Sequence, residues 1–236
     1  MLDECDLSQE KKWHYEQLVK KCATALEKNN MGVHQARDID EARFIVLQLI
    51  PEKATVGFGD SVTLLQAGIT QEIERRWGDR VFNPFRVGLE GVFSLPGREQ
   101  IEIMRKAATA DVFLTGMNAI TQDGKLVNTD GFGNRVGGLI FGPRKVIVIC
   151  GANKIVPDVT AALERIKRVA APINARRHYL KHEAAPVPCA ITGECTDCRH
   201  PWRICNFTVI VDFQRPPREG REPRINVVLV GEELGI

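Results

Sequence analysis

Four cysteines lie close together near the C-terminal end of this sequence, in the stretch PCAITGECTDCRHPWRIC: Cys189, Cys195, Cys198 and Cys205. Cys195 and Cys198 have the spacing at which two thiolates of one turn bind a single metal ion. Four thiolates can hold zinc or an iron–sulfur cluster, and either would stabilise a segment that has no helical or strand periodicity. The spacing therefore predicts a metal site, with zinc and an iron–sulfur cluster both open. A redox-active dithiol and unligated thiols are the alternatives.

A glycine-rich turn is a second candidate site. Gly57 and Gly59 follow a short apolar strand in VGFGDSVT, and Asp60 and Ser61 lead into a helical pattern. Glycines permit close approach by a ligand, and the N–H groups of a first helical turn attract anions. The turn is therefore a candidate phosphate or carboxylate site, although it contains neither a dinucleotide fingerprint nor a P-loop. The alternative is a plain turn in which Asp60 or Ser61 caps the helix.

Polar residues also gather after the next apolar strands. Residues 117–144 are rich in Gly, Asn and Asp, which predicts turns and short strands and no helix. Open α/β sheets bind ligands beyond the carboxyl ends of their strands, so we expect some of these polar residues to line a pocket. Arg135 and Lys154 are the cations that would bind an anionic group there. The candidate ligand-binding residues are Gly57, Gly59, Asp60, Ser61, Gly116, Asn118, Asn128, Asp130, Asn134, Arg135 and Lys154.

Two histidines have a helical spacing. His178 and His182 are four residues apart in NARRHYLKH, so a helix would place both imidazoles on one face. No third metal ligand lies nearby in the sequence. A solvated basic helix is therefore the favoured interpretation, and a metal site is the alternative.

Composition limits the class of protein. A chain of 236 residues can bury a core without disulfides, and its formal net charge of +2 gives no sign of a nucleic-acid partner. The polar N-terminal stretch does not resemble a secretory signal, and no apolar run is long enough for a membrane span. We therefore expect a cytoplasmic protein, in which clustered cysteines indicate metal binding or redox chemistry.

The segments that must position these residues alternate between helical and strand patterns. One helical pattern begins near Ser8, a second ends before Pro51 and a third follows Ser61, and apolar strands come later in DVFLTGM and RKVIVICG. This alternation predicts an α/β fold, a mostly parallel sheet with helices on both faces, and an irregular Cys-rich C-terminal segment. The expected organisation is an N-terminal helical region at 1–50, an α/β core at 51–183, the Cys-rich loop at 184–206, and C-terminal strands completing the core at 207–236.

Several long motifs resemble one family. VGFGDSVT, the stretch from TGMNAITQDGKLVNTDGFGNRVGG to GANKIVPD, ALERIKRVAAPINARRH and INVVLVGEELG are similar to the LUD domain, over roughly residues 10 to 234. This resemblance to LutC- and YkgG-type proteins implies a fold like that of the NagB/RpiA sugar isomerases and CoA-transferases. It also implies a link to the iron–sulfur pathway that oxidises L-lactate to pyruvate. The chain is thus expected to be an accessory protein or subunit in that oxidation, with iron–sulfur proteins as possible partners.

The resemblance also allows a test of mechanism. Isomerases of the methylthioribose-phosphate type, which belong to this superfamily, use an aspartate for acid–base chemistry. The position in this chain that resembles it is Asn118, and Thr129 stands where those isomerases carry a lysine. An amide cannot take up a proton as a carboxylate does, so isomerisation by that route is not expected. No catalytic residue is carried over. An isomerase or acyl- or CoA-transferase-like enzyme that binds a small phosphate or carboxylate, and a non-catalytic ligand-binding domain, are the alternatives.

Overall fold

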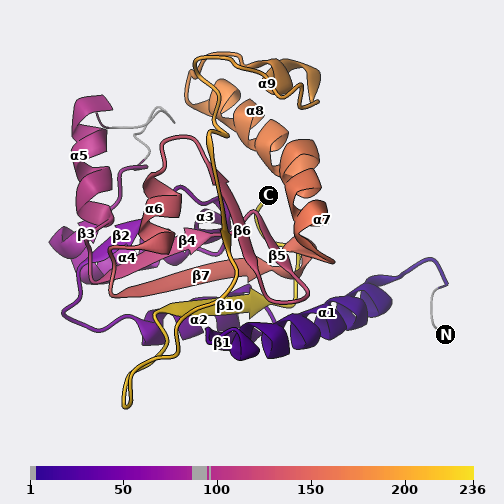
Figure 1. Cartoon of the computed structure of the whole chain (residues 1–236), viewed down its shortest axis with the longest axis vertical. Helices are drawn as coiled ribbons and strands as arrows, with labels where there is room; N and C mark the ends of the chain where they lie inside the picture. Colours follow the sequence, from indigo (N-terminus) through magenta and orange to yellow (C-terminus); the bar gives the residue numbers. More distant parts are fainter. Residues whose placement is uncertain (1–3, 87–94, 96) are drawn as a thin grey trace.

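The computed structural model describes residues 4–86, 95 and 97–236. Its centre is a six-stranded, entirely parallel sheet with the strand order β1-β10-β7-β4-β2-β3 (Figure 1). The strands are β1 (Gly32–Ala36), β2 (Val56–Phe58), β3 (Val81–Phe82), β4 (Val112–Gly116), β7 (Lys145–Gly151) and β10 (Ile225–Val230). Two neighbouring inner strands, β10 and β7, are apolar along almost their whole length, as expected for parallel strands covered on both faces.

A smaller sheet of four strands lies beside the large one, in the order β8-β5-β6-β9. It consists of β5 (Ala119–Thr121), β6 (Leu126–Asp130), β8 (Ile155–Val156) and β9 (Phe207–Val211). β5 and β6 form a hairpin whose turn residue Gly124 has a positive φ of 84°. A side chain there would collide with the backbone of α1, because a Cβ on Gly124 would lie 2.7 Å from the carbonyl carbon of Ala25.

Helices cover both faces of the large sheet. The α-helices are α1 (Ser8–Lys28), α2 (Ile39–Leu49), α3 (Val62–Gln66), α4 (Ile69–Trp77), α5 (Gly97–Ala107), α6 (Asn134–Ile140), α7 (Val159–Arg165), α8 (Ala171–Lys181) and α9 (Pro188–Thr192). Two 3-10 turns, η1 (Gly78–Arg80) and η2 (Ala152–Lys154), and a π-helical turn, η3 (Ile166–Ala170), complete the set. No helix among the described residues is long and apolar enough to cross a membrane.

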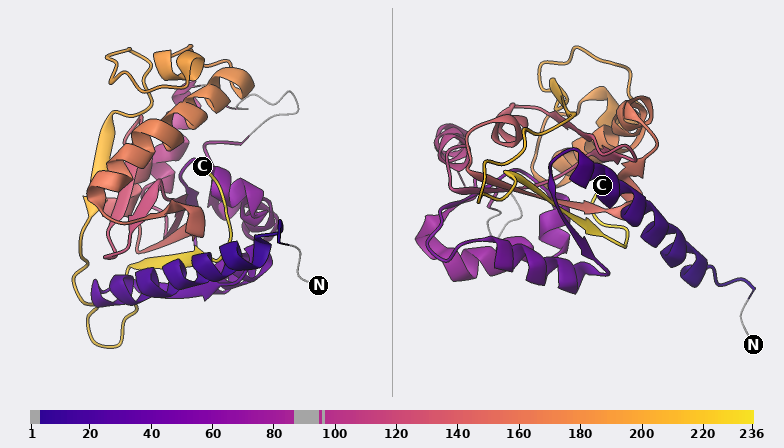
Figure 2. Two further views of the ribbon diagram at one scale, coloured as in Figure 1. Left: turned by 90° about the vertical axis from the view of Figure 1, so that its right-hand side faces the viewer. Right: turned by 60° about the horizontal axis from the view of Figure 1, so that its bottom comes forward.

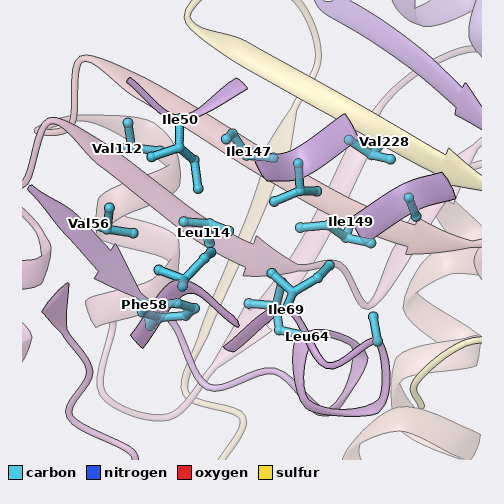
Figure 3. Packing of buried hydrophobic residues seen from close by; sticks show 14 of the residues in the cluster. Ile50, Val56, Phe58, Leu64, Ile69, Val112, Leu114, Ile147, Ile149 and Val228 are labelled. Carbon is cyan, nitrogen blue, oxygen red and sulfur yellow. The ribbon is translucent and has the colours of Figure 1, made fainter. Parts of the chain in front are cut away.

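Two apolar cores hold the layers together. One side of the sheet packs against α2, α3 and α4 through side chains such as Phe58, Leu114 and Ile147 (Figure 3). The other side packs against α1 and the small sheet through residues such as Phe113 and Val148. Each fully buried aliphatic or aromatic side chain contributes about 1.5–3 kcal/mol, so these cores hold the strand ends in place.

The α/β fold with a mostly parallel sheet and helices on both faces is confirmed. The structure adds a strand, β1, within the region 1–50 that was expected to be helical, and α6 within the turn-rich stretch 117–144, where no helix was expected. The single helical pattern expected after Ser61 is divided into α3 and α4 at Gly68, whose φ is 65°. The Cys-rich segment 184–206 is irregular apart from the short helix α9.

Candidate functional site

A cavity of about 870 Å³ opens where the carboxyl ends of β4 and β6 meet the start of α3, η2, α8 and the Cys-rich segment. The structure brings eight of the eleven residues predicted from sequence to its wall: Asp60, Ser61, Gly116, Asn118, Asp130, Asn134, Arg135 and Lys154. Figure 2 shows α8 and the Cys-rich segment at one end of the molecule, away from α1 and α2. The cavity therefore lies between the strand ends and a cap formed by this later part of the chain.

The other three predicted residues support this wall from outside. A Cβ on Gly57 would lie 2.4 Å from the carbonyl oxygen of Ala107, so Gly57 allows α5 to pack closely on β2. A Cβ on Gly59 would lie 2.9 Å from Cγ of Arg135, so Gly59 gives that side chain its path into the cavity. Asn128 is fully buried, and its Oδ1 accepts a hydrogen bond from the backbone N–H of Asn118 at 3.2 Å.

Asp60 connects the glycine-rich turn to α8. Its carboxylate accepts two hydrogen bonds from the guanidinium of Arg177, at 2.9 and 3.0 Å, and its Oδ2 lies 3.3 Å from Nε2 of His178. Burial alone would raise the pKa of Asp60, but the hydrogen bonds and charges of His178 and Arg177 outweigh it and hold the pKa well below its usual range. Asp60 is thus an ionised, paired group, and its charge is compensated within the protein.

The histidine pair faces this cavity. The rings of His178 and His182 are 5.4 Å apart, and both side chains line the wall. A fully solvated helix face was expected, and the structure differs because Asp60 and Arg177 draw this side of α8 onto the strand ends. The partnership of Arg177 with Asp60 was missed, since the two residues are 117 positions apart and no local pattern connects them.

Arg135 enters the cavity from the first turn of α6. Asp130 accepts hydrogen bonds from the backbone N–H groups of Gly131 at 2.7 Å and Arg135 at 2.9 Å, so its carboxylate fixes the turn into α6. The guanidinium of Arg135 donates to the carbonyl oxygen of Thr129 and has no carboxylate within ion-pair distance among the described residues. Burial lowers the pKa of Arg135, although the charges of Asp130 and Asp60 oppose this effect.

Lys154 is a second cation of the cavity wall for which the described residues provide no carboxylate within ion-pair distance. It ends the 3-10 turn η2 after β7, is only 2% exposed, and donates a hydrogen bond from Nζ to Oγ1 of Thr63 at 2.8 Å. Burial lowers the pKa of Lys154 to about 8; the charge of Cys150 opposes this shift, whereas the charges of Arg165 and Arg135 act in the same direction as burial. Thr63 was missed from the sequence, because a threonine in a first helical turn gives no functional signal.

Gly116 lets the hydroxyl groups of this corner pack against β4. A Cβ on Gly116 would lie 2.5 Å from Oγ of Ser61 and 3.1 Å from Oγ1 of Thr63. Ser61 also caps α3, since its Oγ accepts from the N–H of Leu64 at 3.3 Å. The glycine therefore allows two hydroxyl groups and the amine hydrogen-bonded to one of them to meet at the end of β4.

The charges of the cavity favour an anion. The carboxylate of Asp60 is compensated by Arg177, and that of Asp130 is engaged by backbone N–H groups, so neither neutralises Lys154 or Arg135 directly. A buried cation without a counter-ion is costly unless a bound anion pairs with it. A small carboxylate or phosphate has the complementary charge and the hydrogen-bonding capacity for this wall.

The Cys-rich segment forms part of the cap. Within this segment, the guanidinium of Arg203 donates hydrogen bonds to the carbonyl oxygens of Cys198 and Cys205, and the bond to Cys205 is 3.0 Å long. Cys205 also lines the cavity together with Trp202 and Ile204. The metal site predicted at the four cysteines therefore adjoins the predicted ligand site.

The four cysteines of this segment are free, partly buried thiols. Burial, followed by the charges of Cys205, Cys195 and Cys198, raises the pKa of the Cys189 thiol. Within the described residues, no three His, Cys, Asp or Glu side chains are arranged as a group that could hold a metal ion. The thiols are thus neighbours, but their present arrangement is not that of a closed coordination sphere.

Comparison with known proteins gives one family match. A sequence model of the LUD domain matches residues 19–230, a range that includes every residue of the ligand and cysteine sites described above. No curated protein matches the chain. Among solved structures, the crystal structure of a DUF162 family protein from Deinococcus radiodurans is similar, with 12% sequence identity and a TM-score of 0.47 over 92% of this chain and 97% of that chain.

Proposed function

Because the chain belongs to the LUD domain family, which is associated with lactate utilisation, we propose that it is a LutC-like protein that binds a small carboxylate in the cavity. Its role would be that of an accessory protein or subunit in the oxidation of L-lactate to pyruvate, alongside iron–sulfur proteins. The observation that carries this proposal is the pair of cations, Lys154 and Arg135, that line the cavity without a carboxylate partner among the described residues.

A 2-hydroxy or 2-oxo acid matches the groups on this wall. Its carboxylate would pair with Arg135 or Lys154, and its hydroxyl or oxo oxygen would accept or exchange hydrogen bonds with the hydroxyls of Ser61 and Thr63. The two hydroxyl groups can lie together because Gly116, which packs against them, has no side chain.

Thermal unfolding in the presence of ligands tests the proposal. L-Lactate or pyruvate at a hundred times its dissociation constant should stabilise the wild-type protein by ~2.7 kcal/mol. Lys154→Met and Arg135→Met should lose most of this stabilisation, whereas Lys106→Met, at an exposed position on α5, should retain it. If neither acid stabilises the protein, the proposal is wrong. Stabilisation by phosphorylated sugars or acyl-CoA esters alone would favour the isomerase- or transferase-like alternatives.

The second part of the proposal concerns the cysteine segment. We infer that Cys189, Cys195, Cys198 and Cys205 bind zinc or an iron–sulfur cluster, supported by their origin in one segment and by the effect of the other three on the pKa of Cys189. Protein purified without oxygen should contain bound metal, which Cys198→Ser should lose and Cys5→Ser should keep. Absence of zinc and iron from the anaerobic wild-type protein would contradict this part and leave the carboxylate site standing.

A further inference from the structure

Lys154 differs in its surroundings from other lysines of this chain. Lys125 is paired with Asp123 and Asp212, and Lys145 is paired with Glu222, whereas Nζ of Lys154 bonds to the hydroxyl of Thr63. The backbone of Gly235 covers the same group, since a Cβ there would lie 2.5 Å from Nζ. The amine of Lys154 is therefore removed from bulk water and held at the wall of a cavity.

This environment makes the neutral amine easier to reach than in an ordinary lysine. Burial disfavours the ammonium form most, the charge of Cys150 favours it, and the guanidinium groups of Arg165 and Arg135 disfavour it, so the pKa of Lys154 falls to about 8. For Lys125, hydrogen bonds and charges from its two carboxylates raise the pKa instead. A lysine that is desolvated next to other cations is the kind of lysine that acts as a nucleophile toward carbonyl compounds.

Arg135 would place such a carbonyl compound beside Lys154, because both residues line the cavity. Arg165 does not line it: its guanidinium donates to the carbonyl oxygen of Asn118 at 2.7 Å and acts on Lys154 through its charge. The carbon bonded to a carboxylate that pairs with Arg135 would then lie within this same cavity. In a 2-oxo acid, that neighbouring carbon is the electrophilic carbonyl carbon.

We propose that Lys154 forms an imine with a 2-oxo acid bound in the cavity. The inference rests on the proposed carboxylate site and adds a covalent step to it. The lone pair of Nζ attacks the C2 carbonyl carbon, and the carbonyl oxygen leaves as water with both hydrogens of the neutral amine. The product is a C=N bond, and nothing is oxidised or reduced. Hydrolysis by the reverse route releases the acid and restores the lysine.

The imine gives the site a means of distinguishing two acids that differ by one oxidation step. Pyruvate has the carbonyl carbon that the reaction requires, whereas L-lactate has a hydroxyl group at the same position and binds only through its carboxylate and hydroxyl. The cavity would therefore hold the oxidised acid by a covalent bond and the reduced acid without one.

Reductive trapping followed by peptide mapping tests the imine. Wild-type protein incubated with pyruvate and sodium borohydride should carry a stable 1-carboxyethyl group on the amine of Lys154, and incubation with L-lactate and borohydride should give none. Lys154→Arg keeps the positive charge but cannot form an imine, and it should carry no adduct. Lys106→Arg, which alters an exposed lysine on α5, should be trapped at Lys154 like the wild type.

Two outcomes distinguish a failure of the imine from a failure of the proposed carboxylate site. If pyruvate stabilises the wild type and Lys154→Arg equally and no adduct forms on Lys154, or if adducts form equally on exposed lysines, the imine is wrong and the carboxylate site stands. If neither acid stabilises the wild type and no adduct forms, both are wrong.

Discussion

The pair of Asp60 and Arg177 is the main polar link between the glycine-rich turn and α8. The side chains are only 18% and 13% exposed, so each charge depends on the other for compensation. Removing one partner of a buried pair leaves an uncompensated charge, which typically costs about 3–5 kcal/mol.

Arg177→Met should therefore lower the free energy of unfolding by several kcal/mol, measured by urea denaturation. Arg168→Met removes an exposed pair with Glu164 and should change stability by less than about 0.5 kcal/mol. The double variant Asp60→Asn/Arg177→Met should recover part of the loss, because it removes both charges. Equal, small effects of Arg177→Met and Arg168→Met would show that the pair does not hold α8 to the turn.

The buried amine of Lys154 has a consequence for stability that depends on pH. Its pKa is lowered from 10.5 to about 8 in the folded protein, so the unfolded chain binds more protons between these pH values. Wild-type stability should therefore rise through this window, and the full penalty should apply below pH 8.

The variant Lys154→Met has no ionisable group at this position, so its stability lacks this dependence on pH. The stability of this variant relative to wild type should be greatest near neutral pH and should fall by about 3 kcal/mol as the pH approaches 10.5, the ordinary pKa of lysine. Denaturant unfolding of both proteins across this range measures the difference. A difference that does not change with pH would mean that Lys154 keeps an ordinary pKa.

At the scale of elements, the turn between β2 and α3 must lack a side chain at residue 59, because the side chain of Arg135 from α6 passes over it into the cavity. A Cβ on residue 59 would lie 2.9 Å from Cγ and 3.1 Å from Cδ of Arg135, so Gly59→Ala should displace the guanidinium from the carbonyl oxygen of Thr129. We expect this variant to lose about 1–3 kcal/mol of stability and to bind the carboxylate at least about tenfold more weakly.

Gly137→Ala is the matched control for Gly59→Ala. Gly137 lies inside α6, and a Cβ there would meet no heavy atom within 4 Å. Because alanine favours helices more than glycine does, this variant should gain up to about 1 kcal/mol and keep its affinity. Calorimetric titration measures both affinities, and an unchanged affinity in Gly59→Ala would contradict the role given to this turn.

The elements that could be predicted from the sequence are those with a clear local pattern. The apolar runs of β4 and β7, the helix that begins at Ser8 and the turn after β2 all have periodicities or glycines that indicate their structure. The helix α6 could not be predicted, because its start depends on the carboxylate of Asp130 and its glycines resemble a turn. Nor does a local pattern show that β9 pairs with β6 while β10 enters the large sheet.

At the scale of the molecule, the cavity is assembled from segments that are far apart in the sequence. Residues such as Asp60, Asn118 and Lys154 could be placed at one edge of the sheet in advance, because ligands of open α/β sheets bind beyond the strand ends. The cap could not be placed, because its position depends on the contact between α8 and the strand ends. Sequence reasoning therefore placed residues in the floor of this cavity but did not predict its cover.

Among the apolar clusters formed by the described residues, that of the cap is the smallest. The buried apolar cluster that joins α8 to the Cys-rich segment consists of Ala175, Val187 and Ala190, with Cys189 and Ile204 partly buried beside it. The two main cores are much larger and include Phe58 and Phe113. Because local opening requires least energy where few apolar contacts are lost, the cap should open more readily than the sheet.

Ligand binding should therefore be visible as slower hydrogen exchange in the cap. A carboxylate held between the strand ends and the cap must be released before the cap opens, so saturating pyruvate should increase amide protection in residues 171–206. Protection in α2 should not change, because Ala42 and Val46 pack into the core on the opposite face of the sheet. Hydrogen exchange with mass spectrometry measures both regions, and Lys154→Met should abolish the response in the cap. A uniform increase across the chain, or a change confined to α2, would mean that the cap does not close over the ligand.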